Sequence, residues 1–351
     1  MPVLAAAFLT LTGCAAPNYY AQAVHGQLSL MLARRPLNEV LAAPETPAEV
    51  RLALTLARDA RDFAHTTLGL PDNGSYQSYV DLHRPHVVWN VFAAPPYSLE
   101  LRPSCFLLVG CLTYRGYFSE AAAHRHADRL RARGDDVFVG GVAAYSSLGW
   151  FADPLLSSML RWDEATLVRT LFHELAHQWF YLPGDTTFNE SFAMTVAEAG
   201  LVRWWRARHP GAPLPEDFAH EEAFVALVLE YRDQLSELYA SALPEPEKRR
   251  RKHDVLAALR EDFARSASGW REMADYSRWL EQDLNNAKLA SVATYHAWMP
   301  AFRALLARSD GDLSRFRGAV ADMGGLPSAA RENALRALAA EPPVTQQASQ
   351  P

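Results

Sequence analysis

The stretch LFHELAHQWFYLPGDTTFNESFA, residues 171–193, decides how the second half of the chain is expected to fold. Apolar residues recur at spacings of four from Leu167 to Trp179, which predicts a helix over 162–182 with one buried stripe. The turn residues of LPGDTT end this helix, and a second helix is expected to open at FNESFA. Two helices joined by so short a loop are expected to pack antiparallel.

His173 and His177 are four residues apart, so both imidazoles lie on one face of the first helix, about one turn from each other. Two nitrogens placed in this way can share one zinc ion, and a catalytic zinc site needs a third protein ligand. Glu190, in the first turn of the second helix, is the expected third ligand. Glu174 projects beside the metal, where its carboxylate can take a proton from the attacking water. The pattern predicts a site for one Zn2+ with Glu174 as general base.

Other assignments stay open at these positions. Asp185, on the loop, is an alternative third ligand, and Glu198, two turns after Glu190, is expected to orient a ligating histidine. The histidines could also lie on an ordinary helix with satisfied side chains, or in a zinc fold that has lost catalysis.

The run HELAHQWF followed by FNESFA resembles the aminopeptidase N-like gluzincins, in which H-E-x-x-H-Q-W-F is followed on the next helix by N-E-G-F-A. The resemblance implies a zincin-like fold in which His173, His177 and Glu190 bind zinc and Glu174 is the general base. Two departures stand out. Only 12 residues separate His177 from Glu190, fewer than is usual in that group, and Ser191 replaces the glycine.

A wider set of segments resembles a smaller family of bacterial lipoproteins regarded as aminopeptidases, and this resemblance covers most of the chain. The segments are YRGYF (114–118), AYSSLGWFADP (144–154) and NNAKLASVATY (285–295). This second resemblance implies a zinc metallopeptidase acting on peptides, with aminopeptidase as the first expectation. A zinc endopeptidase and a non-catalytic peptide-binding lipoprotein remain the alternatives.

The resemblance also implies that the strand before the zinc helix, GGVAAYSS at 140–147, borders the substrate cleft and pairs with an extended peptide. Tyr145 and Ser146 are expected to line that cleft, although a strand tyrosine also suits a core. This strand lacks the glutamate that binds a substrate's α-amine in aminopeptidase N-like enzymes, so the sequence does not separate exopeptidase from endopeptidase action.

Zinc peptidases also need a hydrogen-bond donor for the oxyanion that forms on the attacked carbonyl. Tyr295 is the candidate, with Tyr239 and His296 behind it, and a packed core tyrosine is the alternative for Tyr295. Asn285 and Asn286 are expected to hydrogen-bond backbone near the cleft.

Outside this region, residues 19–68 have a helical pattern, and strand-like runs follow at 86–94, 104–114 and 136–147. A helix at 118–134 separates the last two runs, and nearly everything from 163 to 336 has a helical pattern. The expected fold is α+β and predominantly helical, with a small sheet in the N-terminal half. The expected divisions are 1–14 as a lipoprotein signal, 15–162 with the sheet, 163–340 with the zinc helix, and a disordered tail at 341–351.

The N-terminal run MPVLAAAFLTLTGC resembles a bacterial lipobox, with Leu11, Thr12 and Gly13 before Cys14. The resemblance implies acyl chains on Cys14 and a protein anchored in the cell envelope. The absence of Asp after Cys14 favours the outer membrane, facing the periplasm. No Lys or Arg precedes the apolar run, which departs from the usual signal.

Composition and charge narrow the classes of partner that are expected. The chain has 351 residues, a formal net charge of -6 and scattered basic residues, so nucleic acid is not an expected partner. Cys105 and Cys111 are either a disulfide, which requires a turn at Gly110, or a reduced buried pair. The sequence does not indicate the oligomeric state.

Overall fold

The structure is a computed structural model that describes residues 15–106, 109–282 and 284–341. The predicted lipoprotein signal with Cys14 and residues 342–351 of the predicted tail lie outside the described residues. The strands are β1 (Arg35–Pro36), β2 (Ser78–Val80), β3 (Val88–Ala94), β4 (Ser104–Phe106), β5 (Gly110–Leu112), β6 (Arg115–Tyr117), β7 (Asp136–Val142) and β8 (Leu155–Leu156). The helices up to the candidate site are α1 (Ala15–Leu32), α2 (Leu37–Ala42), α3 (Ala48–Thr66), α4 (Glu120–Arg131), the short η1 (Met159–Arg161) and α5 (Glu164–Trp179). The remaining helices are α6 (Thr186–Arg208), α7 (Asp217–Ala240), α8 (Glu245–Ser266), α9 (Met273–Glu281), α10 (Asn286–His296), α11 (Met299–Arg308), α12 (Leu313–Gly324) and α13 (Ser328–Ala339).

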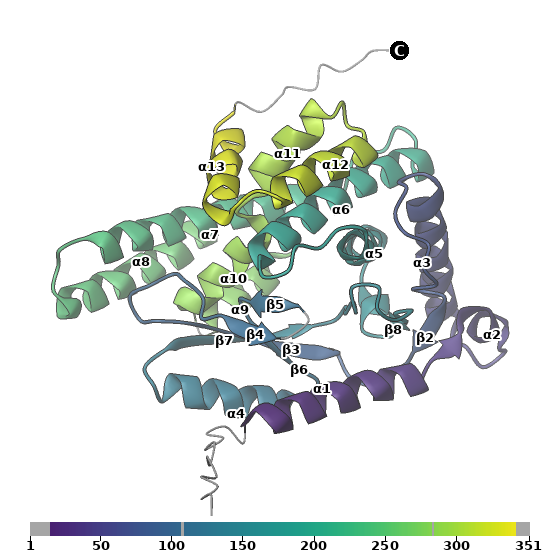
Figure 1. The fold of residues 1–351 in the computed structure, drawn as a ribbon, viewed down its shortest axis with the longest axis horizontal. Coiled ribbons are helices and arrows are strands. Elements are labelled where there is room, and N and C mark those ends of the chain that lie inside the picture. The colour runs from purple at the N-terminus through teal and green to yellow at the C-terminus, as the bar shows by residue number, and fades with distance from the viewer. Residues whose placement is uncertain (1–14, 107–108, 283, 342–351) are drawn as a thin grey trace, which may run out of the picture.

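The central sheet has the order β6-β3-β7, and all its pairings are antiparallel. Strand β3 is buried along its whole length because helices cover both faces of the sheet. Trp89, Val91 and Ala93 pack with α4, whereas Phe92 and Ala94 pack with Ala287 of α10. Figure 1 shows α4 below the sheet and α10 above it. The sheet therefore fixes the position of α10, which carries the Tyr295 predicted at the site.

Helices α5 and α6 form the centre of the helical half, and local signals explain both of their starts. Asp163 caps α5 by accepting a hydrogen bond from the Thr166 amide, and Asp185 caps α6 by accepting one from the Phe188 amide. Between the helices, Gly184 adopts a φ of 85°, which few other residues tolerate. The predicted pair of helices is confirmed, with α6 beginning two residues before the expected FNESFA.

The prediction of one strand over 104–114 is wrong. The segment folds into a hairpin in which β4 pairs antiparallel with β5, and Cys105 lies opposite Cys111 and is bonded to it in a disulfide. Gly110 has a φ of 77°, so the turn required there is present. The disulfide alternative is confirmed, and the hairpin packs on the α5–α6 loop, where the Tyr181 hydroxyl donates to the Val109 carbonyl at 3.2 Å.

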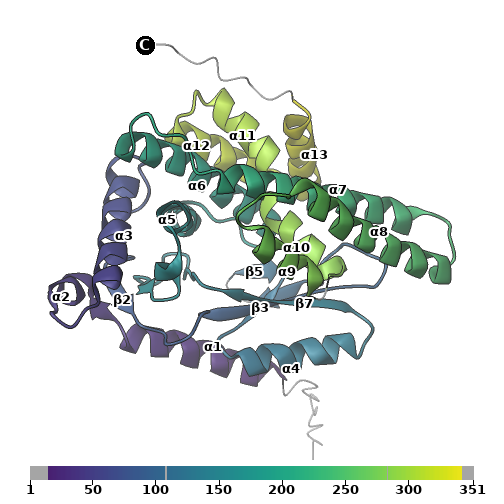
Figure 2. The same cartoon turned by 180° about the vertical axis from the view of Figure 1, so that it is seen from behind.

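The hydrophobic core has one large part and one smaller helical part. The large part contains residues from Leu30 to Leu338 and includes the buried faces of α3, α5 and α6. The smaller part lies mainly between α7, α8 and α9, and the α7–α8 pair extends away from the sheet in both views (Figures 1 and 2). The expectation of an α+β, predominantly helical fold is confirmed. Across the described ranges, none of the helices combines the length and apolar character that crossing a bilayer requires.

Gly200 of α6 tests how closely the central helices pack. A Cβ at this position would lie 2.8 Å from both Leu68 Cδ1 and Phe172 Cδ2, whereas a Cβ at the exposed Gly318 of α12 would contact nothing. We expect Gly200→Ala to lower the free energy of unfolding by about 1–3 kcal/mol through overpacking. The control Gly318→Ala should raise it by up to about 1 kcal/mol through helix propensity. Urea unfolding measures both, and a stabilised Gly200→Ala protein would contradict the packing described.

Candidate metal centre

Three buried side chains from α5 and α6 converge on one point. His173 Nε2 lies 3.2 Å from Glu190 Oε2, His177 Nε2 lies 3.3 Å from the same oxygen, and the two Nε2 atoms are 3.1 Å apart. The residues predicted as ligands are thus brought together by the antiparallel packing of the two helices. Glu190 is the fifth residue of α6, in its second turn rather than its first.

This triangle has the dimensions of a metal site. A tetrahedral zinc ion with bonds of about 2.0–2.1 Å separates neighbouring ligand atoms by about 3.3 Å, close to the three edges found here. The Nδ1 atoms of both histidines are buried and have no hydrogen-bond partner among the described residues. Two imidazole nitrogens and a carboxylate oxygen aimed at one point form a donor set suited to zinc.

The pKa shifts of Glu190 and His177 are consistent with a site that binds a positively charged ion. Burial alone would raise the pKa of Glu190, but His177 and the hydrogen bonds from both histidines outweigh it and lower that pKa to about 2. Burial would lower the pKa of His177, and Glu190 reverses this and raises it. Glu190 therefore stays ionised at neutral pH and is available as a ligand.

Glu174 lies beside the triangle without being part of it. It is on α5 next to His173 and lines the same cavity, where it is partly accessible. Burial raises its pKa above the ordinary value of 4.5, and the two histidines oppose this effect only in part. A carboxyl with a raised pKa is suited to exchange a proton with a substrate or water.

Side-chain contacts hold the start of α6. Asn189 clamps the preceding loop, because its Oδ1 accepts from the Leu182 amide at 2.7 Å and its Nδ2 donates to the Leu182 carbonyl at 2.8 Å. Asp185, the alternative ligand, caps the helix and receives hydrogen bonds from Arg331 at 2.9 and 3.2 Å. Its carboxylate is engaged there, so the structure favours Glu190 over Asp185.

The structure contradicts the role expected for Glu198. Its carboxylate is paired with the Arg303 guanidinium at 2.6 and 2.9 Å, on the side of α6 that faces α11. Two turns of helix carry the side chain past the histidine face, and within the described residues no hydrogen bond joins it to either imidazole. Glu198 is a structural ion-pair residue.

A cavity of about 950 Å³ opens onto the triangle. Its wall includes Glu174 and the three converging residues, and the predicted Tyr145 and Ser146 both line it. Most of the remaining lining is aromatic or aliphatic, and α1, the β4–β5 hairpin and the loop after β7 all contribute to it. The cavity is large enough for several residues of an extended peptide.

Tyr295 of α10 also lines the cavity, and its ring centroid lies 6.3 Å from that of His173. Burial, with the charge of Glu190, raises the pKa of Tyr295 well above 10, so its hydroxyl remains a donor. Ser191 fixes this part of α10: its hydroxyl donates to the Tyr295 carbonyl at 3.1 Å and accepts from the Trp298 amide at 3.2 Å. The serine that departs from the gluzincin pattern therefore links the helix bearing Glu190 to the helix bearing Tyr295.

The other residues considered for the oxyanion have different roles. Tyr239 donates to the Asn286 side chain at 2.7 Å, and neither Tyr239 nor His296 is among the described residues that line the cavity. Asn286 in turn donates to the carbonyls of three residues after β3, and Asn285 donates to the Val137 carbonyl at 3.1 Å. The two asparagines bond backbone as expected and tether α10 to the sheet.

Sequence reasoning missed Tyr114 and Arg169, which both line the cavity. Tyr114 lies close enough to Glu190 for that charge, together with burial, to raise its pKa well above 10, and Tyr114 and Tyr295 influence each other. Arg169 is the one lysine or arginine among the described residues that line the cavity. Its guanidinium is paired with Glu221 at 2.6 Å. Tyr114 belongs to the YRGYF segment and directly follows the hairpin, which the sequence left as one of two alternatives.

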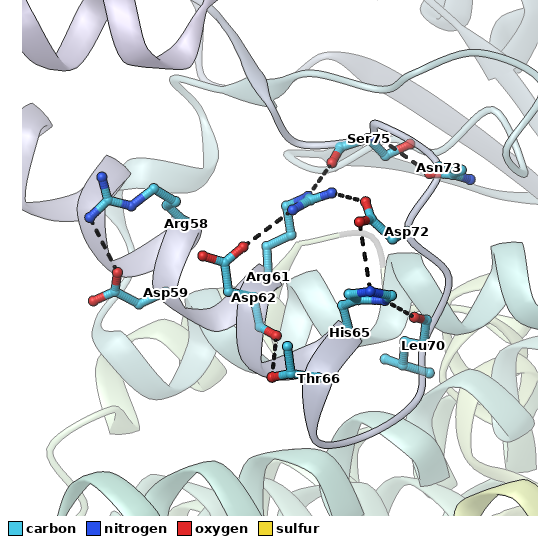
Figure 3. Close-up of polar contacts among 10 residues, drawn as sticks. All are labelled: Arg58, Asp59, Arg61, Asp62, His65, Thr66, Leu70, Asp72, Asn73 and Ser75. Atoms are coloured by element: carbon cyan, nitrogen blue, oxygen red, sulfur yellow. Dashed lines mark hydrogen bonds and ion pairs between the residues drawn. The ribbon is translucent and has the colours of Figure 1, made fainter.

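A polar network supports the cavity loop from behind. Figure 3 shows Arg61 of α3 reaching Asp62, Asp72 and the Ser75 carbonyl, which fixes the segment after α3. In that segment Asn73 donates to Gln178 of α5 at 2.8 Å, and Gln178 donates to Asp153 at 3.4 Å. Because Asp153 accepts from the Ser147 amide at 2.8 Å, the network holds the loop that carries Ser146 against α5.

A second group of possible ligands, Asp217, His220 and Glu272, is less suited to a metal. Arg271 pairs with Asp217 at 2.6 Å and with Glu272 at 2.9 Å, so a cation already balances the carboxylates. His220 stacks on Trp270 with ring centroids 4.4 Å apart. This group is explained as a surface ion-pair cluster.

The fold and the site thus define an α+β, predominantly helical protein with a buried His-His-Glu group that could hold a metal ion. Residues 18–335 match the family Aminopep, described as "Putative aminopeptidase", and the chain belongs to this family. No curated protein and no solved structure matches the chain.

The link made by Ser191 predicts a measurable loss of stability. Ser191→Ala should lower the free energy of unfolding by about 1–3 kcal/mol, because it leaves the Tyr295 carbonyl and the Trp298 amide without this partner. Ser291→Ala is the control, since among the described residues the Ser291 hydroxyl bonds only a carbonyl one turn earlier in its own helix. Equal effects of the two substitutions in urea unfolding would contradict the role given to Ser191.

The metal-free site should also make stability depend on pH. The raised pKa of His177 stabilises the fold below its ordinary value of 6.5, and this effect is lost as pH rises through the raised pKa. The lowered pKa of Glu190 stabilises the fold above 4.5, and this effect is lost as pH falls toward about 2. Thermal unfolding of chelator-treated protein should therefore show the largest advantage over Glu190→Gln between pH 4.5 and 6.5. An advantage that is independent of pH would contradict this electrostatic account.

Proposed function

We propose that the protein is a zinc-dependent peptidase, in the first place an aminopeptidase, that hydrolyses peptide bonds with Glu174 as general base. The observation that carries the proposal is the triangle of His173, His177 and Glu190, with edges of 3.1–3.3 Å, beside a carboxyl of raised pKa. Membership of a family described as aminopeptidases supports a peptidase, and the gluzincin-like motif supports the zinc mechanism.

Each residue has a distinct task in this proposal. Zinc held by the three ligands would polarise the scissile carbonyl and lower the pKa of the attacking water. Glu174 takes a proton from that water and returns it to the leaving amine nitrogen. Tyr295, kept protonated by its raised pKa, donates a hydrogen bond to the carbonyl oxygen as negative charge develops on it. Tyr114 faces the same region and is a second candidate donor.

An endopeptidase is the second candidate, and one observation favours it. The acidic side chains in the described cavity wall are Glu174 and Glu190, and both already have tasks at the metal. Asp153, the next carboxyl, is buried behind Ser146 and accepts hydrogen bonds from the cavity loop. An aminopeptidase that binds the substrate α-amine through a carboxylate would have to use Glu174 or Glu190 for it.

We further propose that Cys14 carries acyl chains that anchor the protein in the cell envelope, at the outer membrane and facing the periplasm. The support is the LTGC sequence at 11–14, after an apolar run too short to span a bilayer as a helix.

Peptide cleavage by the full chain tests the proposed activity. The substrates are defined peptides, each supplied with a free and with an acetylated N-terminus, and mass spectrometry follows the products. We expect Glu174→Gln to lower the turnover by about 10²–10⁴-fold while zinc remains bound, because only the proton transfer is removed. Ladders from free N-termini alone indicate an aminopeptidase, and internal cuts in both peptide sets indicate an endopeptidase.

Glu198→Gln is the matched control, since Glu198 is on the adjacent helix but pairs with Arg303. It should keep the wild-type rate. If zinc-loaded wild type and Glu174→Gln bind the peptides equally and neither cleaves them, the peptidase proposal fails and a peptide-binding protein takes its place.

A further inference from the structure

Helix α1 has an inner face that is firmly attached to the rest of the protein. The Gln22 side chain accepts a hydrogen bond from the Phe118 amide at 3.0 Å, and the Tyr19 ring lies beneath the Arg115 guanidinium at 4.0 Å. Gly26 approaches the Phe118 ring so closely that an added Cβ would lie 2.1 Å from it. The helix is therefore held against β6 in one orientation. These contacts determine which of its side chains face away from the protein.

The opposite face carries a line of exposed apolar side chains, with the exposed polar residues His25 and Ser29 next to it. Tyr20, Val24, Leu28 and Leu32 are spaced by four, and their exposed fractions are 44, 57, 55 and 87%. Residues 18–32 contain no Asp, Glu, Lys or Arg, which is unusual for a helix at the surface of a protein. Figures 1 and 2 show α1 along the lower edge of the molecule, and the exposed fractions of these four side chains show that the rest of the described protein leaves them uncovered.

Most of the exposed large hydrophobic side chains gather near this face. Nine such residues occur in the described part of the chain, and six of them are the four residues of α1 together with Trp150 and Phe151. The loop bearing Trp150 and Phe151 lines the same cavity as Tyr19, Tyr20 and Ala23 of α1. Helix α1 and this loop thus form an apolar rim beside the cavity.

We propose that this apolar rim, Tyr20, Val24, Leu28, Leu32, Trp150 and Phe151, is a membrane-docking surface that rests in the interface of a lipid bilayer. An uncharged helix of 18 residues, about 27 Å long, with a line of exposed apolar side chains can lie in the interface although it cannot span the bilayer. The cysteine proposed to be acylated, Cys14, directly precedes the first residue of α1. A lipid anchor there would hold the start of the helix at the membrane.

The consequence concerns the cavity, because α1 forms one of its walls and also the docking surface. If the proposed peptidase function is also correct, the substrates are polypeptides held at or near the membrane surface. The docking surface itself does not depend on zinc or turnover, so it can be tested separately.

The test is photolabelling of the full chain on vesicles of phosphatidylethanolamine and phosphatidylglycerol that contain a phospholipid with a diazirine on its acyl chain. After irradiation, digestion and mass spectrometry locate the attached lipid. We expect label in residues 18–33 and 148–154, and only background in the peptides that carry Leu52, Leu214 and Leu326, the other exposed hydrophobic residues.

The double substitution Val24→Glu/Leu28→Glu should lower the label in 148–154 by at least about tenfold, because one fully buried aliphatic side chain is equivalent to about a factor of ten in partitioning. Both residues are exposed, so the fold should not change, and an unaltered circular dichroism spectrum checks this. Leu52→Glu is the control and should leave the labelling unchanged. Label confined to residues 1–17, or spread equally over the control leucines, would overturn the proposal. The absence of label from residues 18–33 would also overturn it, and this result is expected if another protein segment covers α1.

Discussion

The antiparallel packing of α5 against α6 is the constraint on which the candidate site depends. It sets the His173–His177 face opposite Glu190, and it does so through a connection of only residues 180–185. Such a short loop leaves little freedom, and Asn189 removes more by bonding both backbone groups of Leu182. The ligand atoms therefore meet at 3.1–3.3 Å as a result of helix packing and not of flexible side-chain adjustment.

The rest of the molecule builds a cavity around that helix pair. The sheet carries α10, and Ser191 joins α10 to α6, so the Tyr295 hydroxyl is positioned by contacts remote from the histidines. On the other side, the network from Arg61 through Asn73 and Gln178 supports the loop with Ser146. Part of the cavity wall is α1, whose outer face is apolar, which connects the proposed chemistry with the proposed location at a membrane.

Local signals made the centre of the site predictable. The four-residue spacing of the histidines, the cap at Asp185 and the Asn-Glu pair are all contained within about 25 residues. The β3 strand was equally clear as a buried apolar run, and α10 and Tyr295 could be placed at the site only by resemblance. Glu198 was misassigned because its position in a helix does not show which side chain its carboxylate will pair with. Its partner, Arg303, is more than 100 residues further along the chain.

The residues that were missed depend on long-range contacts. Tyr114 follows the hairpin that Cys105 and Cys111 close, and the sequence left this disulfide, with its turn at Gly110, as one of two alternatives. Helix α1 and Arg169 were missed in the cavity wall because neither has a motif that points to a pocket.

The most direct test of the central claim is anomalous X-ray diffraction at the zinc edge from crystals of the full chain grown with zinc. The account predicts one strong peak within about 2.0–2.2 Å of His173 Nε2, His177 Nε2 and Glu190 Oε2, the range of zinc bonds to nitrogen and oxygen. The absence of a peak among these three atoms, in crystals saturated with zinc, would contradict it.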